Sequence, residues 1–104
     1  MLYMFFGVDG PDGPKLRDTV REEHFAYLAK HADKLVLGGA TLADEDDTRT
    51  GSLLIINVPN RAAADAFADA EPFRGAGVFS SYTISRMRRG QWTPDNAPKT
   101  AEGE

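Results

Sequence analysis

Two arginines and a histidine recur along one stretch of the chain at helical spacing. Arg17, Arg21 and His24 are separated by four and then three residues, so in a helix their side chains lie on one face. Guanidinium groups bind carboxylates and other oxyanions, and an imidazole transfers protons near neutral pH. The pattern predicts a helix over residues 17–31 that turns a polar, cationic stripe inward. Because the burial of an unpaired charge is costly, we expect a polar cavity beside that stripe.

Each of these side chains also has a purely structural interpretation. His24 resembles a core histidine that bonds a backbone carbonyl, although the neighbouring arginines favour a functional site. Arg17 and Arg21 are placed to pair with acidic residues, Arg21 with Asp18 or Glu71 for example, or to bind a substrate oxyanion bidentately. For Arg17 we favour the ion pair, and for Arg21 both interpretations stay open.

Two further polar residues are weaker candidates. Ser52 follows Gly51 at the start of an expected strand, where its hydroxyl is placed to donate to a ligand. No base in the sequence supports Ser52 as a nucleophile. His31 lies near the end of the expected helix, where a cation is favoured by the helix dipole, and we expect a structural or surface position for it.

Composition excludes several classes of function. The 104 residues carry a net charge of −4, which argues against nucleic acid or an anionic membrane as a partner. The absence of cysteine and the presence of only two histidines argue against thiolate chemistry and a metal site, so we expect no cofactor. No stretch approaches the roughly 20 apolar residues of a membrane span. Because the opening MLYMFFGV lacks the basic region of a secretory signal, we expect a cytoplasmic protein.

The positioning elements follow from apolar runs and turn residues. A second helix is expected at 61–70, capped by Asn60 and ended by the Glu71-Pro72 step, with a turn at 74–77. Residues 1–90 form one predicted domain, and 91–104 a loosely ordered tail. The acidic segment 43–51 is predicted to be a solvated hairpin loop. Strands are predicted at 2–8, 35–42, 52–58 and 78–87.

The order β-α-β-β-α-β predicts an α+β fold of the ferredoxin-like plan, with an antiparallel sheet. Two helices cover one face of such a sheet. The strands at 2–8 and 52–58 are nevertheless apolar on both faces. We therefore expect a homodimer that buries the open sheet face against a second copy, the arrangement called a dimeric α/β barrel.

Three motifs make the chain resemble the YciI-like (YCII-related) proteins over residues 1–90. They are RxxxRxxHF from Arg17, TGS at 50–52 and EPFxxAGVF from Glu71. The resemblance implies an active site that pairs the histidine of the first helix with the acidic residue before the proline, here His24 and Glu71. The family's usual acid at this position is aspartate. The extra methylene of Glu71 is expected to shift the carboxylate by about 1 Å, a misplacement that can cost about 100-fold in rate, and Asp69 is a candidate to compensate.

These observations support two hypotheses of different class. The first is a cofactor-independent enzyme in which the catalytic pair is His24 and Glu71. Its chemistry would be of the lyase or isomerase type, on a small oxygenated cyclic or aromatic metabolite, and its substrate-binding candidates are Arg21, Arg17, Ser52 and Phe73. The alternative is a non-catalytic dimeric module for ligand binding, or an accessory or regulatory partner. A contact between His24 and Glu71 beside an open pocket favours the enzyme, whereas a pair sealed in the core contradicts it.

Overall fold

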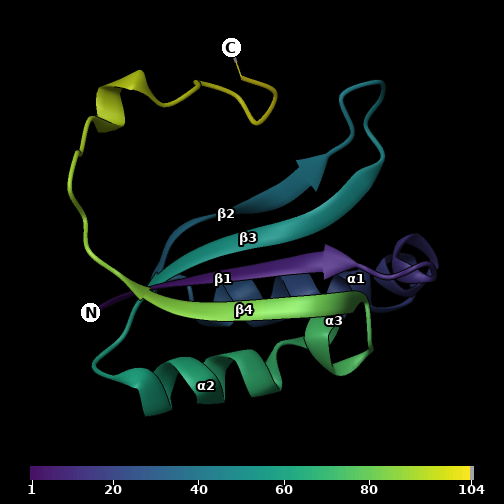
Figure 1. Cartoon of the computed structure of the whole chain (residues 1–104), viewed down its shortest axis with the longest axis horizontal. Coiled ribbons are helices and arrows are strands. Elements are labelled where there is room, and N and C mark those ends of the chain that lie inside the picture. Colours follow the sequence, from purple (N-terminus) through teal and green to yellow (C-terminus); the bar gives the residue numbers. More distant parts are fainter. Residues whose placement is uncertain (104) are drawn as a thin grey trace.

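Four antiparallel strands form one sheet in the order β2-β3-β1-β4 (Figure 1). The structure is a computed structural model and describes residues 1–103. The strand β1 is central, with Phe5 paired to Leu54 of β3 on one side and to Ile84 of β4 on the other. The elements in chain order are β1 (Leu2–Asp9), α1 (Gly13–Lys30), β2 (Leu35–Leu42), β3 (Arg49–Asn57), α2 (Arg61–Ala70), α3 (Pro72–Gly75), β4 (Phe79–Met87) and a 3₁₀ turn (Pro94–Asn96).

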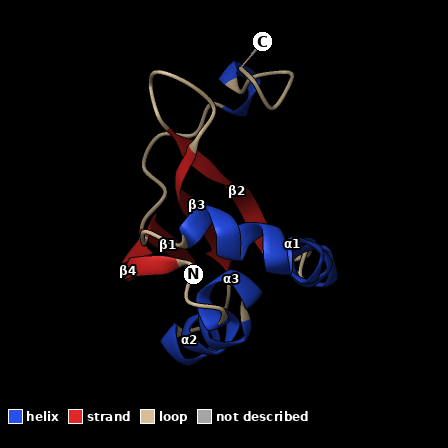
Figure 2. Ribbon diagram, turned by 90° about the vertical axis from the view of Figure 1, so that its right-hand side faces the viewer, coloured by secondary structure: helices blue, strands red, loops and turns tan. Residues whose placement is uncertain are grey.

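The helices lie on one face of the sheet, as Figures 1 and 2 show. Alternate residues of the strands point toward them, so Tyr3 and Phe5 of β1 pack against Phe67 of α2. The small residues of α2 let that helix approach the sheet closely, and Asn60 caps it by accepting from the Ala63 N–H at 2.8 Å. The expected ferredoxin-like α+β fold is therefore confirmed.

Three local features differ from the prediction. β3 begins at Arg49 rather than at residue 52, because the hairpin with β2 continues to the pair Leu42–Arg49. The backbone of α1 leaves the helical range at Val20 (φ −115°, ψ 16°), so the helix is kinked. α2 ends at Ala70, as the Glu71-Pro72 step predicts, but Pro72 then begins the short helix α3 where only a turn was expected, because the extended Glu71 caps it.

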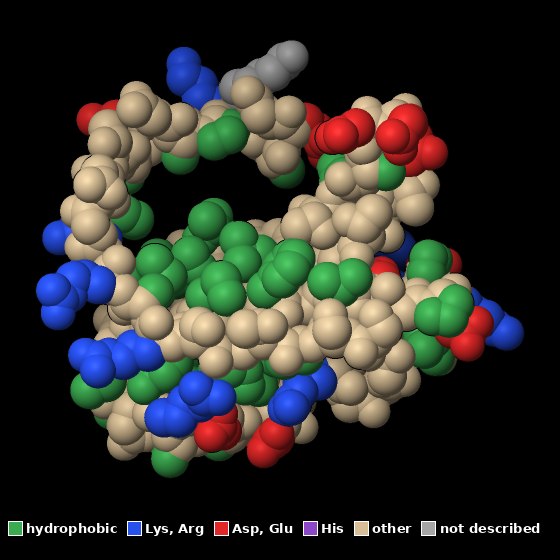
Figure 3. Space-filling view, in the orientation of Figure 1, with side chains coloured by type: hydrophobic (Ala, Val, Ile, Leu, Met, Phe, Trp, Pro, Cys, Tyr) green, Lys and Arg blue, Asp and Glu red, His purple; other side chains and the backbone are tan. Residues whose placement is uncertain are grey.

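The other face of the sheet carries an apolar patch made of the alternate residues of the two central strands. Met4 pairs with Ile55 and Phe6 with Leu53 across β1 and β3, all four on the side away from the helices. Figure 3 shows apolar side chains gathered over this face and a hollow between them and the C-terminal tail, which arches over the sheet (Figure 1). Within residues 1–103 no helix is long and apolar enough to cross a membrane.

Candidate active site

The structure brings His24 of α1 into direct contact with Glu71, which stands between α2 and α3. The imidazole Nδ1 and the carboxylate Oε1 are hydrogen-bonded, and both residues are buried. The second oxygen, Oε2, accepts the backbone N–H of Arg74 at 3.0 Å, the capping contact of α3. Because a carboxylate accepts hydrogen bonds, Nδ1 is the donor, and Nε2 is the ring nitrogen left for other chemistry.

Phe73 fixes the plane of the imidazole. Its ring stacks on that of His24 with centroids 3.7 Å apart and an interplanar angle of 6°. The Arg17 guanidinium carbon lies 5.0 Å from the centroid of the same phenyl ring. The negative face of an aromatic ring attracts cations, so Phe73 joins two of the predicted site residues.

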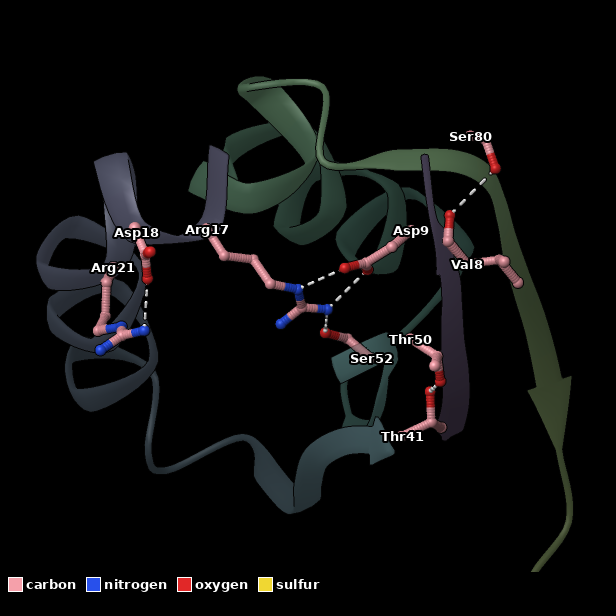
Figure 4. A network of polar contacts seen from close by, with 9 residues as sticks. All are labelled: Val8, Asp9, Arg17, Asp18, Arg21, Thr41, Thr50, Ser52 and Ser80. Carbon is pink, nitrogen blue, oxygen red and sulfur yellow. Dashed lines mark hydrogen bonds and ion pairs between the residues drawn. The ribbon is translucent and has the colours of Figure 1, made fainter. Parts of the chain in front are cut away.

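Arg17 is buried in a polar network that Figure 4 shows at close range. Its Nε and Nη2 donate to the two carboxylate oxygens of Asp9 at 2.7 and 2.8 Å, and Nη2 also donates to Ser52 Oγ at 2.9 Å. The ion pair expected for Arg17 is present, and its partner is Asp9 at the end of β1. A side chain at Gly13 would place its Cβ 2.7 Å from Asp9 Oδ2, so glycine leaves room for this carboxylate.

Arg21 does not continue the buried stripe. The kink at Val20 lies between the two arginines, and Figure 4 shows Arg21 turned toward Asp18, whose Oδ1 accepts from its Nη2 at 2.7 Å. Both side chains are more than half exposed. Of the two acidic partners considered for Arg21, the structure places Asp18 beside it.

These side chains line an open cavity of about 410 Å³ between α1 and the β2–β3 hairpin. Gly38 and Gly39 of β2 line one wall of the cavity and carry no side chains that would fill it. Ala101 of the tail also lines the cavity. The complete lining is Arg17, Arg21, His24, Phe25, Leu28, Gly38, Gly39, Ala40, Arg49, Ser52, Leu54, Phe73 and Ala101. A cavity of this size is in the range of small-molecule sites.

Nε2 of His24 is accessible from this cavity. Within residues 1–103 the Nε2 atom has no hydrogen-bond partner. Every fully buried side-chain nitrogen or oxygen of these residues does have one. An unbonded Nε2 must therefore be exposed, and His24 lines the cavity. The same reasoning applies to Nη1 of Arg17, which has no partner in the network of Figure 4.

Behind the imidazole, Tyr82 of β4 shares a space of about 10 Å³ with His24, Glu71 and Ser52, at most the size of one water molecule. Burial raises the pKa of Tyr82 above its ordinary value, and the nearby negative charge of Glu71 raises it further. The phenol therefore stays neutral and closes the back of the site. Residues 1–103 hold no group of three or more His, Asp or Glu side chains arranged to bind a metal ion.

Asp69 and His31 lie outside the site, His31 as expected, and two further residues were not predicted. Asp69, considered as a substitute for Glu71, is exposed and pairs with Arg74 at 2.6 Å, so it does not contact His24. His31 packs its ring 4.5 Å from that of Tyr27, outside the cavity lining. The missed residues are Asp9 and Arg49. The position of Asp9, directly after an expected strand, could have marked it as a site candidate. The sequence offered no such indication for Arg49, which lies in the segment expected to be a loop.

Comparison with known proteins places this geometry in a family. The model of the YCII-related domain matches residues 1–88. The chain belongs to the YCII-related family. The protein YciI of Escherichia coli O6:H1 is 31% identical over an alignment of 96 residues, and the match covers 86% of this chain and 98% of that protein. The YciI protein of Shigella flexneri matches equally well.

Solved structures give the same fold. The 5-chloro-2-hydroxyhydroquinone dehydrochlorinase TftG from Burkholderia phenoliruptrix AC1100, in complex with 2,5-dihydroxybenzoquinone, superposes with a TM-score of 0.79. It is 31% identical, and the match covers 86% of this chain and 96% of TftG. An antibiotic biosynthesis monooxygenase, 18% identical with a TM-score of 0.52 over 88% of this chain and 100% of that one, shares the fold alone.

Proposed function

We propose that this protein is a cofactor-independent enzyme that performs lyase-type acid–base chemistry on a small oxygenated ring. The observation that carries the proposal is His24, buried and oriented through Nδ1 by Glu71, with Nε2 open to a cavity. A histidine held in this way is suited to general acid–base catalysis, because one nitrogen is fixed while the other exchanges a proton with the substrate. Support for the reaction class comes from TftG, a dehydrochlorinase of similar fold.

The cavity suits a substituted ring. An apolar cavity of about 150 Å³ holds benzene, so about 410 Å³ leaves room for one ring with several oxygen substituents. In the proposed step Nε2 of His24 takes a proton from the substrate, the freed electron pair forms a new double bond, and the leaving group departs with its bonding electrons as an anion. Glu71 keeps Nδ1 as the donor nitrogen throughout and faces the imidazolium that forms.

The arginines are placed to hold substrate oxygens. Nη1 of Arg17 is the donor left over from its pair with Asp9, so it points a fixed positive group at the cavity. Arg21 pairs with Asp18 on the surface, and such exposed pairs are worth about 0–1 kcal/mol, so a substrate oxyanion can compete for its guanidinium. Ser52 is held as an acceptor by Arg17 and acts in this proposal as a wall residue.

A matched pair of histidine variants tests the proposal. In His24→Asn the amide nitrogen takes the place of Nδ1 and still donates to Glu71, but Nε2 is gone. His31→Asn makes the same change at the C-cap of the same helix, outside the cavity. We expect His24→Asn to lower kcat/KM by about 10²–10⁴-fold and His31→Asn to leave it unchanged.

The assay follows chloride release and ring absorbance with chlorinated hydroxyhydroquinones, and proton shifts with hydroxylated aromatics and lactones. Binding of 2,5-dihydroxybenzoquinone is measured in parallel by calorimetry. If the wild type binds the quinone but turns over none of these compounds, the protein is a ligand-binding module and not an enzyme of this class. Equal activity in His24→Asn and the wild type would remove His24 from the chemistry.

The same proposal includes a homodimer through the open sheet face. The apolar patch around Met4, Phe6, Leu53 and Ile55 is of the kind that marks an interface, and the hollow under the tail leaves it accessible (Figure 3). We expect the wild type to elute with the mass of a dimer in light scattering and Leu53→Asp to elute as a monomer. Ala62→Glu, a change on the exposed side of α2, is the control; a monomeric wild type contradicts the proposal.

A further inference from the structure

We infer that Arg49 selects substrates that carry a negative charge, and that it does so at the β3 wall of the cavity. The charged and titratable side chains that line the cavity are all basic: three arginines, at positions 17, 21 and 49, and His24. No aspartate or glutamate of residues 1–103 lines it. This is the reverse of the whole chain, whose net charge is −4, so the positive lining is a local property of the site.

The three arginines are not equally free to meet a ligand. Arg17 has its charge offset by a bidentate contact with Asp9, which leaves Nη1 for a ligand, and Arg21 pairs with Asp18. Arg49 forms no ion pair with any acidic side chain of residues 1–103, and it is exposed. The uncompensated positive charge that faces the cavity therefore comes mainly from Arg49.

The position of Arg49 separates charge recognition from proton transfer. It is the first residue of β3, paired across the hairpin with Leu42, whereas His24 stands on α1. A substrate ring with one edge against His24 would present its other edge to Arg49 on β3. The guanidinium fork matches a carboxylate, or an oxygen pair that shares one negative charge, and lysine lacks this planar geometry.

The neighbouring acidic hairpin loop does not remove this charge. Asp46 lies three residues before Arg49 and accepts the backbone N–H of Thr48 at 2.8 Å. The Thr48 side chain, and after it this backbone bond, lowers the pKa of the Asp46 carboxyl. Asp46 forms no ion pair with Arg49 within the described chain.

This inference rests on the proposed function, because it names the substrate class of the same site. The test therefore measures binding, not turnover, in the His24→Asn background. Two probes differ in charge at nearly constant shape: 2,5-dihydroxybenzoquinone, whose hydroxyls are vinylogous carboxylic acids and ionise at neutral pH, and its neutral dimethyl ether. The variants are Arg49→Gln, Arg49→Lys and Arg88→Gln, which removes the same charge away from the cavity lining.

We expect Arg49→Gln to weaken binding of the anionic quinone by about tenfold, the size of one charge-assisted hydrogen bond at a partly exposed site, and to leave binding of the ether unchanged. Arg49→Lys recovers part of the loss, Arg88→Gln shows none, and added salt weakens the anion alone. Equal loss for both probes, equal loss in Arg88→Gln, or no binding of the anionic quinone to the wild type overturns the inference. Loss of charge discrimination without any wild-type turnover supports it while refuting the enzyme proposal.

Discussion

Replacing Arg17 by methionine removes the guanidinium that holds the end of β1 against the start of α1. The two hydrogen bonds to Asp9, at 2.7 and 2.8 Å, join side chains that are each 6% exposed. The single variant leaves a carboxylate buried without its partner, which costs about 3–5 kcal/mol. Asp9→Asn leaves the guanidinium in the corresponding position and is expected to cost a similar amount. For a chain of this size that is a large part of the total stability, about 5–15 kcal/mol.

The double variant Asp9→Asn/Arg17→Met removes both charges together. We expect it to cost about 2–3 kcal/mol less than the sum of the single variants, because neither charge is left alone. The free energies come from urea unfolding followed by circular dichroism at one fixed protomer concentration, since self-association would otherwise shift the apparent stability.

An exposed pair provides the matched control. Arg61 and Asp65 of α2 are joined at 2.8 Å, within 0.1 Å of the buried contacts, but both side chains are about half exposed. Their double-mutant cycle is expected to give about 0.3–0.5 kcal/mol. If the cycle for Asp9 and Arg17 gives a coupling no larger than this, burial does not strengthen the pair and the reasoning is wrong.

Three further outcomes follow from single positions. Gly13→Ala places a methyl group 2.7 Å from an oxygen of the anchored Asp9 and should cost about 1–2 kcal/mol in urea unfolding, whereas Gly75→Ala, with open space around it, should cost nothing measurable. Asn60→Ala removes the cap of α2 and should cost about 1 kcal/mol by the same measurement, and an unchanged midpoint would contradict the capping role. The raised pKa of Tyr82 means that the fold favours the neutral phenol. This contribution to stability is complete at pH values below the unfolded-state pKa of 10.0 and is lost as the pH rises toward the folded-state pKa. Above pH 10 the free energy of unfolding should therefore fall less in Tyr82→Phe than in the wild type.

The sequence predicts the fold well because its signals are local. An apolar run that ends before Gly10 and Pro11 marks β1, and Asn60 and Pro72 mark the two ends of α2. The start of β3 is missed because its first residues, Arg49 and Thr50, are polar and lie on an exposed hairpin. Nothing in their types separates the end of a strand from a loop. Hydrogen bonding to β2, a tertiary property, decides the boundary.

The site is less predictable because its contacts join distant residues. Spacing alone predicts that Arg17, Arg21 and His24 share one face, but the kink at Val20 divides them, so that Arg17 is buried with Asp9 and Arg21 is on the surface. The contact of His24 with a residue 47 positions later has no periodic signal, and only the family resemblance pointed to it.

Glu71 links the stability of the fold to the geometry of the site. One of its oxygens orients His24 and the other caps α3. The glutamate therefore contacts the histidine, although its side chain is one methylene longer than the aspartate usual in the family. In Glu71→Gln one oxygen becomes an NH₂ group, which must then face either the backbone N–H of Arg74 or the Nδ1–H of the histidine. The first loosens α3, and with it Phe73, which stacks on the imidazole; the second forces the other tautomer. A loss of activity in Glu71→Gln would therefore mix a structural and a chemical cause, whereas His24→Asn leaves the cap intact and isolates the proposed proton transfer at Nε2.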